Sequence, residues 1–268
     1  FEGMRRFPRY GYLIVTLLLW LTAVPGNSQN VYFNNFYTDP GNNSWDPALC
    51  VLDSAIYTSN RYDFDTNYRG VGLFKFDFEG NLLWKKDFRD DTFSIANNYT
   101  ILNNDTILGL ILTKAIKNGM IDHHRFVHCK PDGSIVLDTT TYFPDSIGIS
   151  ASCMLPDGSM ALSGVQHIGD TNIIWKMIKI DRYGQIDWIR DLPLNNSPKA
   201  RSNVGFDIEP TPDGGFVLSG RSDAYFQAKT IQGMVIKTDS LGDIEWIKDY
   251  GTWWFSSAFR VEVKDSII

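Results

Sequence analysis

Apolar and polar residues alternate in short strand-like runs separated by tight turns over most of the chain. In the clearest stretch, from 204 to 250, strand-like pieces occupy 206–209, 216–219, 234–238 and 244–248. The first two are joined by Pro212-Asp213-Gly214-Gly215 and the last two by Asp239-Ser240-Leu241-Gly242. Proline presets φ, aspartate bonds its own backbone and glycine accepts positive φ, so both segments are turn formers. Two such hairpins in sequence predict a four-stranded antiparallel meander.

The same pattern recurs along the chain, marked by an aspartate and a small residue at the first turn of each copy. The recurring aspartates are Asp53, Asp105, Asp157, Asp213 and Asp265, at steps of 52, 52, 56 and 52 residues. Repeated four-stranded units of this length indicate propeller blades. A tryptophan follows the glycine of the second turn by four residues in three copies, as Trp84, Trp188 and Trp246. We interpret it as a plug between blades; Leu137 takes its place in the second copy.

The repeat predicts an all-β fold, a β-propeller of four-stranded antiparallel blades. We place the blades at 46–90, 97–143, 150–194 and 204–250. Residues 258–268 are expected to begin a further blade, because Phe259, Val261 and Val263 alternate ahead of Asp265. The predicted ring is therefore incomplete. Residues 31–37 resemble the last strand of a blade, so we hypothesise that the segment 29–45 carries a ring-closing strand.

The N-terminal residues have the order of a secretory signal. Met4 is followed by three arginines, an apolar run at 12–21 and small or turn-forming residues at 23–28. The apolar run is about half of the ~20 residues that a membrane-spanning helix needs. We predict a signal peptide at 4–28, a protein secreted or held at the outer cell surface, and no membrane span after signal removal. The alternative is a buried helix or membrane anchor.

The amino-acid composition limits the classes of binding partner that we expect. The net charge is −6 and lysine and arginine fall mostly singly, which argues against a nucleic-acid surface. We expect a monomer whose partner is an unknown protein or glycan. There are three cysteines. Cys50 and Cys153 take nearly equivalent places ahead of a repeat aspartate and are interpreted as small buried hydrophobes; a bridge between Cys129 and Cys153 is the alternative.

One candidate metal site stands in the sequence. Asp63, Asp65 and Asn67 form a D-x-D-x-N run, the opening of a calcium-binding loop. Tyr68 and Phe74 stand where such a loop needs glycine and glutamate. A looser calcium turn and a solvated loop are the two interpretations left open.

The histidines offer little chemistry. His124 and His128 share a face of one predicted strand, but they lie ~13 Å apart at about 3.3 Å per residue. Two ligands of one zinc ion cannot be so distant. With His123 they are expected to be exposed. No nucleophile elbow or glycine-rich phosphate loop occurs, and no catalytic residue is assigned.

Loops that break the repeat are the expected sites of binding, at 57–70, 222–232 and 251–257. The last loop holds Trp253, Trp254 and Phe255, aromatic side chains of the kind that stack on sugar rings. Packing between blades is the other interpretation of these three residues.

The copies PDGGFVLSGRS…GMVIKTDSLGDIEWIKDYG and WKMIKIDRYGQIDWIRDL resemble the repeats of secreted bacterial β-propellers of the Bacteroidetes type. Those blades have the pattern Asp-Gly-Gly / Lys-x-Asp-x-x-Gly-x-x-x-Trp, and the resemblance covers residues 46–268. It implies export, often with a C-terminal type IX secretion sorting domain, which these residues lack. The repeat is similar more loosely to the tryptophan-docking repeats of quinoprotein dehydrogenases. The Asp-to-Gly spacing here is one residue shorter and no cofactor-site residue matches, so no cofactor is expected.

These observations together predict an exported, non-enzymatic propeller that binds or scaffolds at the cell surface. The alternative is a propeller enzyme, a hydrolase or lyase or a quinoprotein-like oxidoreductase, with its site in the central channel. The alternative requires unrepeated charged residues that converge at one end of the ring.

Overall fold

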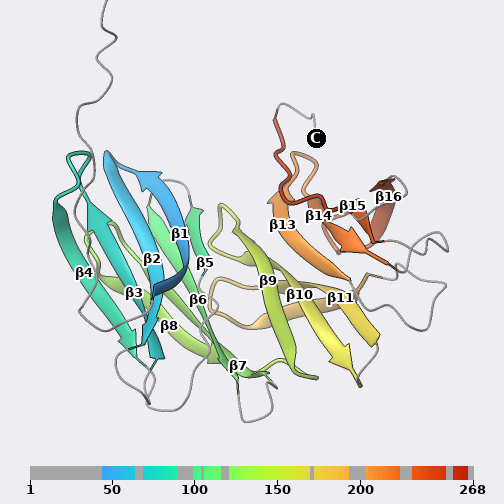
Figure 1. Cartoon of the computed structure of the whole chain (residues 1–268), viewed down its shortest axis with the longest axis horizontal. Helices are drawn as coiled ribbons and strands as arrows, with labels where there is room; N and C mark the ends of the chain where they lie inside the picture. The colour runs from blue at the N-terminus through green and yellow to red at the C-terminus, as the bar shows by residue number, and fades with distance from the viewer. Residues whose placement is uncertain are drawn as a thin grey trace, which may run out of the picture. The chain divides into compact units, whose positions relative to one another are not determined.

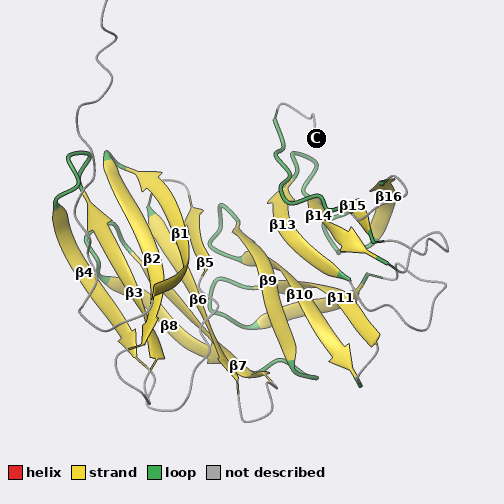
Figure 2. Cartoon of the chain, in the orientation of Figure 1, coloured by secondary structure: helices red, strands yellow, loops and turns green. Residues whose placement is uncertain are grey.

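The structure, a computed structural model, describes residues 44–63, 69–89, 99–103, 106–115, 121–169, 172–192, 203–223, 231–251 and 256–264. In these residues it contains sixteen strands and no helix (Figures 1 and 2). The chain divides into two compact units, Phe1–Phe36 and Tyr37–Ile268, and the described residues all belong to the second. The predicted signal peptide at 4–28 and the predicted strand at 31–37 lie outside the described residues. Within that described part, no helix is long and apolar enough to span a membrane.

The strands group into four blades. Blade 1 contains β1 (Ser44–Leu52), β2 (Ala55–Asp63), β3 (Arg69–Phe76) and β4 (Leu82–Arg89). Blade 2 contains β5 (Tyr99–Asn103), β6 (Ile107–Ala115), β7 (Ile121–Cys129) and β8 (Ile135–Thr141). Blade 3 contains β9 (Ile147–Met154), β10 (Met160–Ile168), β11 (Asn172–Ile180) and β12 (Ile186–Asp191). Blade 4 contains β13 (Val204–Pro210), β14 (Phe216–Ser222), β15 (Gln232–Thr238) and β16 (Ile244–Tyr250).

Each blade is one antiparallel sheet in which the strand order follows the chain. The first strands of successive blades contact one another, β1 with β5, β5 with β9 and β9 with β13 (Figure 1). First strands in contact are the innermost strands of a propeller. The fold is therefore a four-bladed β-propeller, which confirms the all-β class predicted from the repeat.

The described segment 256–264 includes the first seven of residues 258–268, which the sequence predicts to begin a further blade. It forms no strand, and Lys264 is a single bridge residue. It lies against blade 4 through the N–H of Ala258, which donates to Gly220 O at 3.0 Å, and the ring of Phe259, 4.9 Å from that of Phe206. We call residues 256–264 the strap.

Aspartate and glycine form the turns as the sequence predicts. In the second turn of blade 4, Asp239 Oδ1 accepts from the backbone N–H groups of Leu241 and Asp243, both at 2.9 Å. The first turns differ among blades. Blade 1 has a two-residue turn in which Asp53 and Ser54 both have positive φ, the type I′ geometry of tight hairpins. Blade 3 has a longer loop, closed by Asp157 Oδ1 accepting from Ser159 N–H at 2.9 Å.

A β-bulge follows the second turn in every blade. In blade 3, Lys179 is paired with Trp188 but Ile180 with Ile186, so one extra residue lies on β12. The same shift pairs Lys75 with Trp84 in blade 1. Alternation along the strand predicts that Ile186 and Trp188 share a face. The structure corrects this: the bulge places Ile186 against the core between blades 2 and 3 and Trp188 against the core between blades 3 and 4.

A hydrophobic cluster fills each of the three joints between successive blades. Trp175 at the joint between blades 3 and 4 is fully buried, and its Nε1–H donates to Ser163 Oγ at 2.7 Å. Its indole fits against two glycines of blade 4. A Cβ added at either Gly205 or Gly220 would lie 2.6 Å from the ring. Close approach of the two sheets therefore requires glycine there.

Two histidines expected on the surface are buried. His124 is fully buried at the joint between blades 2 and 3, where Nε2–H donates to Ile147 O at 2.8 Å. Its Nδ1 accepts from the hydroxyl of Thr113 at 2.9 Å, which fixes the neutral tautomer. Burial lowers the pKa of His124 to about 4. His128 is buried on the same strand, and burial lowers its pKa too.

All three cysteines are free thiols, and they sit in positions suited to small hydrophobes. Cys129 packs between blades 1 and 2 and Cys153 between blades 3 and 4. Cys50 is paired with Tyr57 and Cys153 with Ala161, so each faces the residue four places after its repeat aspartate. Burial raises the pKa of Cys50 and Cys129 to about 11 and that of Cys153 to about 12.

Candidate functional site

Most of the residues singled out as binding candidates lie outside the described part. Trp253, Trp254 and Phe255 belong to this group, as do Asp65 and Asn67 of the candidate calcium loop. Asp63 ends β2, where it is paired with Arg69. In the described residues no three histidine, cysteine, aspartate or glutamate side chains gather closely enough to hold a metal ion.

A groove lies between the first turns of blades 3 and 4. It has a volume of about 540 Å³. Its walls come from the β9–β10 turn, the β13–β14 turn and the strap: Leu155, Pro156, Asp157, Pro210, Thr211, Pro212, Gly214 and Val263. Most of these side chains are apolar, and the three prolines have no N–H to offer. The groove therefore presents an apolar surface with one carboxylate, that of Asp157, in its lining.

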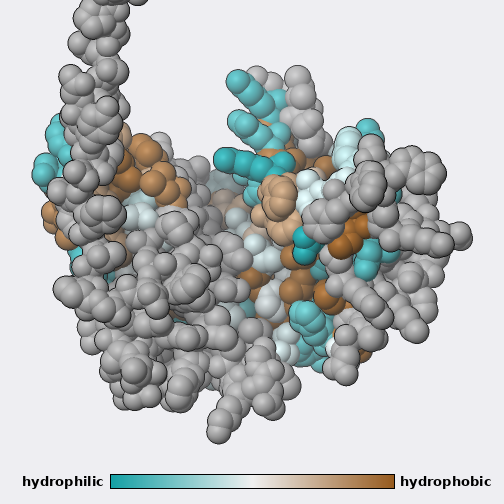
Figure 3. All heavy atoms as spheres, in the orientation of Figure 1, coloured by the Kyte–Doolittle hydropathy of each residue, from teal (hydrophilic) through white to brown (hydrophobic). Residues whose placement is uncertain are grey.

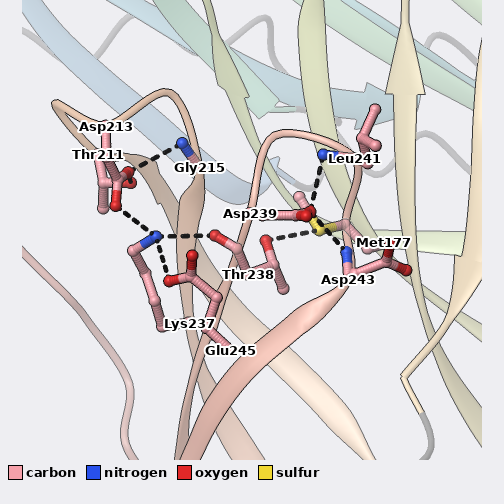
Figure 4. A network of polar contacts seen from close by, with 10 residues as sticks. All are labelled: Met177, Thr211, Asp213, Gly215, Lys237, Thr238, Asp239, Leu241, Asp243 and Glu245. Atoms are coloured by element: carbon pink, nitrogen blue, oxygen red, sulfur yellow. Dashed lines mark hydrogen bonds and ion pairs between the residues drawn. The ribbon is translucent and has the colours of Figure 1, made fainter.

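The aspartate of the β13–β14 turn, Asp213, stabilises the fold. Asp213 Oδ1 accepts from the Gly215 N–H at 3.0 Å, and its Oδ2 lies 2.9 Å from Lys237 Nζ (Figure 4). Lys237 is 5% exposed and also donates to Glu245 Oε2 and Thr238 O, each at 2.9 Å (Figure 4). Hydrogen bonds from Thr211 and Lys237 hold the pKa of Asp213 far below its usual value. Burial alone would lower the pKa of Lys237, but its two carboxylate partners raise it.

Two further carboxylates, Asp207 and Glu209, lie on β13, next to the groove residue Pro210. The intervening Ile208 packs into the core between blades 3 and 4, so by strand alternation Asp207 and Glu209 point away from blade 3. Asp207 Oδ2 accepts from the Val261 N–H of the strap at 3.0 Å. We call the space between β13 and the strap, lined by Asp207, Glu209, Arg260 and Glu262, the acidic seam.

Glu209 is the residue of the acidic seam whose pKa is raised. Burial is the first cause of its raised pKa, and the negative charges of Asp207 and Glu262 add to it. Arg260 acts in the opposite direction. A half-buried carboxyl group with a raised pKa beside a second carboxylate is a recognised candidate for ligand binding or proton transfer. Neither carboxylate bonds its own turn, so the seam is chemistry that the turns do not explain.

Both carboxylates are unrepeated, which is how sequence comparison alone could have found them. Glu209 is paired with the residue four places after the turn aspartate, and that position is Cys50 in blade 1, Ile101 in blade 2 and Cys153 in blade 3. The position of Asp207 is Ala151 in blade 3. Blade 3 directs Ala151 and Cys153 into an apolar joint, whereas blade 4 directs two acids toward the strap. The signal in the sequence is therefore a departure from the repeat, not a recurring residue.

Exposed apolar side chains also gather on the innermost strand of blade 1. Leu49 is 70% and Val51 54% exposed, and Figure 3 shows apolar residues at the end of β1. The surfaces of β1 and β13 therefore differ in chemistry although they occupy equivalent places in their blades.

No protein-family model matches the chain, and no curated protein matches its sequence. Among solved structures, a Bacteroides caccae protein of unknown function has a TM-score of 0.41 at 12% identity, with 74% of this chain covered. This chain spans 58% of that protein's length. The GH43_1 enzyme from Xanthomonas citri, solved with xylotriose, has a TM-score of 0.44 at 13% identity, covering 76% of this chain and 73% of its own.

The polysaccharide lyase Uly1 has a TM-score of 0.44 at 9% identity, covering 76% of this chain and 48% of its own. At these scores and identities the likenesses carry no argument about activity. The chain is assigned as a β-propeller on its own strand order and pairing.

Proposed function

We propose that this chain is an exported β-propeller, of the Bacteroidetes type that its repeats resemble, and that it binds a glycan outside the cell without transforming it. One observation supports this most. The recurring polar residues are used in turns, whereas the carboxylates of the acidic seam, Asp207 and Glu209, are not repeated in the other blades. A sugar ring has an apolar face that suits the proline-lined walls and hydroxyl donors that suit carboxylates. A protein ligand is the other candidate from the sequence.

Binding to a glycan array tests the proposal, with the full chain as probe. Glu209→Gln keeps the shape of the side chain but removes its charge, and we expect at least a tenfold loss of binding. Glu79→Gln is the matched control, because Glu79 is an exposed carboxylate in a turn of blade 1. Trp253→Ala and Trp254→Ala test whether these aromatic side chains add stacking on a sugar ring. If no glycan binds, or if Glu209→Gln binds as the wild type does, the groove and seam are not the site.

A second function, acid–base catalysis, is favoured by one observation, the raised pKa of Glu209 beside Asp207. A carboxyl group that holds its proton can protonate a leaving group while a neighbouring carboxylate acts as base or nucleophile. Release of reducing ends or of unsaturated uronic acids from polysaccharides measures hydrolase or lyase turnover. Turnover that Glu209→Gln abolishes and Glu79→Gln leaves intact would replace binding by catalysis as the function of the seam.

Export is proposed from the signal-like residues 4–28. Expression of the full chain in a Gram-negative host, followed by N-terminal sequencing of the exported product, should give a mature chain that starts near Gln29. A product that stays in the cytoplasm with its leader intact contradicts the proposal.

A further inference from the structure

A tryptophan of one blade contacts the second turn of the next. At the joint between blades 1 and 2, Pro131 O accepts from Trp84 Nε1–H at 3.2 Å and Lys75 Nζ at 3.1 Å. The Trp84 ring covers Gly133, where an added Cβ would lie 3.5 Å from it. Lys86, two residues along β4, donates to Gly133 O. Tryptophan and lysine together thus cap one hairpin turn.

The joint between blades 3 and 4 has the same arrangement, a tryptophan over a turn glycine and a basic side chain beside the turn. The ring of Trp188 lies 2.8 Å from where a Cβ on Gly242 would stand. Arg190, two residues further on, has its Nε 3.9 Å from Asp243 Oδ1. The boundary between blades 2 and 3 lacks the tryptophan, and there the hydroxyl of Thr141 donates to the turn carbonyl of Gly184. A turn glycine with a covering side chain is common to all three joints.

Blade 4 carries the same pair, Trp246 and Lys248, on β16. Ile247 between them packs toward blade 3, so both side chains point to the opposite face of the sheet. The strap lies on that face too, because its Val261 N–H bonds Asp207. Lys248 Nζ stands 5.3 Å above the Trp246 ring, and within the described part of the chain neither side chain meets a hairpin turn.

We propose that Trp246 and Lys248 form a docking site for the second hairpin turn of a further blade of this repeat, with the pattern Asp-x-x-Gly. The indole covers the turn glycine and donates from Nε1 to a turn carbonyl, as Trp84 does to Pro131. Lys248 meets an acidic residue directly after the turn glycine, as Arg190 meets Asp243. The interface continues the one that the strap has begun on this face of blade 4, and it is independent of any ligand in the groove.

A cyclised hairpin peptide of residues 235–245 (VIKTDSLGDIE) tests the site, because this is the turn that Trp188 covers and it contains no tryptophan. The peptide is added to the full chain carrying ¹⁵N-labelled tryptophan. The indole N–H resonance of Trp246, assigned by its absence in Trp246→Phe, should shift saturably while the other indole resonances stay fixed. Calorimetry should show at least tenfold weaker binding for Trp246→Ala.

Two controls make the result specific. Tyr183→Ala removes an exposed aromatic from a turn of blade 3 and should bind the peptide as the wild type does. A peptide with valine in place of its glycine should not bind, because the side chain would meet the indole. A Trp246 resonance that does not move, or equal binding by Trp246→Ala, would overturn the proposal. The wild-type resonance gives this answer even if a variant fails to fold.

Discussion

The covering of Gly242 by Trp188 predicts a large difference between two glycines of blade 4. Gly242 and Gly214 have nearly the same φ, 82° and 84°. A Cβ at Gly214 meets nothing within 4 Å, whereas one at Gly242 would lie 2.8 Å from two carbons of Trp188. Replacing either glycine by alanine costs about 1 to 2 kcal/mol for the left-handed backbone. Gly242→Ala should cost a further ~1 to 3 kcal/mol because the indole must move.

Urea denaturation of the two variants gives the free energies of unfolding directly. The excess cost at Gly242 is assigned to the joint by a double-mutant cycle with Trp188→Ala. In that background Gly242→Ala should cost about as much as Gly214→Ala, roughly 1 to 2 kcal/mol. The clash with the indole is gone, and the remaining contact, 3.0 Å to Arg190 Cγ, is with a flexible side chain. If the two glycine variants are equal within about 0.5 kcal/mol, or if the cycle shows no coupling, the blades are not joined through this contact.

Three further outcomes follow from the buried and bonded groups. In the unfolded chain His124 takes up a proton below its ordinary pKa of 6.5, whereas in the native chain it does so only near pH 4. The free energy of unfolding is therefore highest above pH 6.5 and falls as the pH drops toward 4, by up to about 3 kcal/mol. Urea titrations at pH 7, 6 and 5 should show this decline flattened in His124→Gln, and an undiminished slope contradicts the buried neutral ring. The hydrogen bonds of Asp213 stabilise the fold above its ordinary pKa of 3.8, and this stabilisation is lost progressively below it. Asp213→Asn should therefore lower the free energy of unfolding at pH 7 and lose less of it on acidification below pH 4. A parallel decline in the variant and the wild type contradicts this. The three thiols, with pKa values raised to about 11 or 12, should react with a disulfide reagent at pH 8 far more slowly than the unfolded chain does, and equal rates would show that they are not protected.

The sequence predicts the blades well because their signals are local. Asp239 and Gly242 determine a turn within four residues, and the hydrogen bonds they make in the structure are those that the residue types favour. The recurrence of such turns gives the four-stranded meander and hence the propeller. The assignment of tryptophan to the joints follows in the same way, and Trp84 and Trp188 both cover a turn glycine of the next blade.

The faces of the outer strands could not be predicted from alternation. The bulge that separates Ile186 from Trp188 is defined by which residues of β11 they are paired with, and cross-strand pairing is not a local property. The burial of His124 has the same origin. Its acceptor, Ile147 O, belongs to the next blade, 23 residues further along the chain. The residues of β7 alone therefore do not predict that His124 is buried.

The acidic seam sits where blade 4 departs from the repeat, and the departure has an energetic cost. Blade 3 places Ala151 and Cys153 in the joint that leads to blade 4, and their burial stabilises both sheets. Blade 4 places Asp207 and Glu209 at the equivalent points, where burial disfavours the charged form of Glu209. A repeat that served stability alone would keep small apolar residues here, because nothing in the turns requires a carboxylate at these positions. Residues that weaken local packing without forming the fold are where function is expected. For this reason the seam, and not the recurring turn aspartates, is the place to look for what this propeller binds.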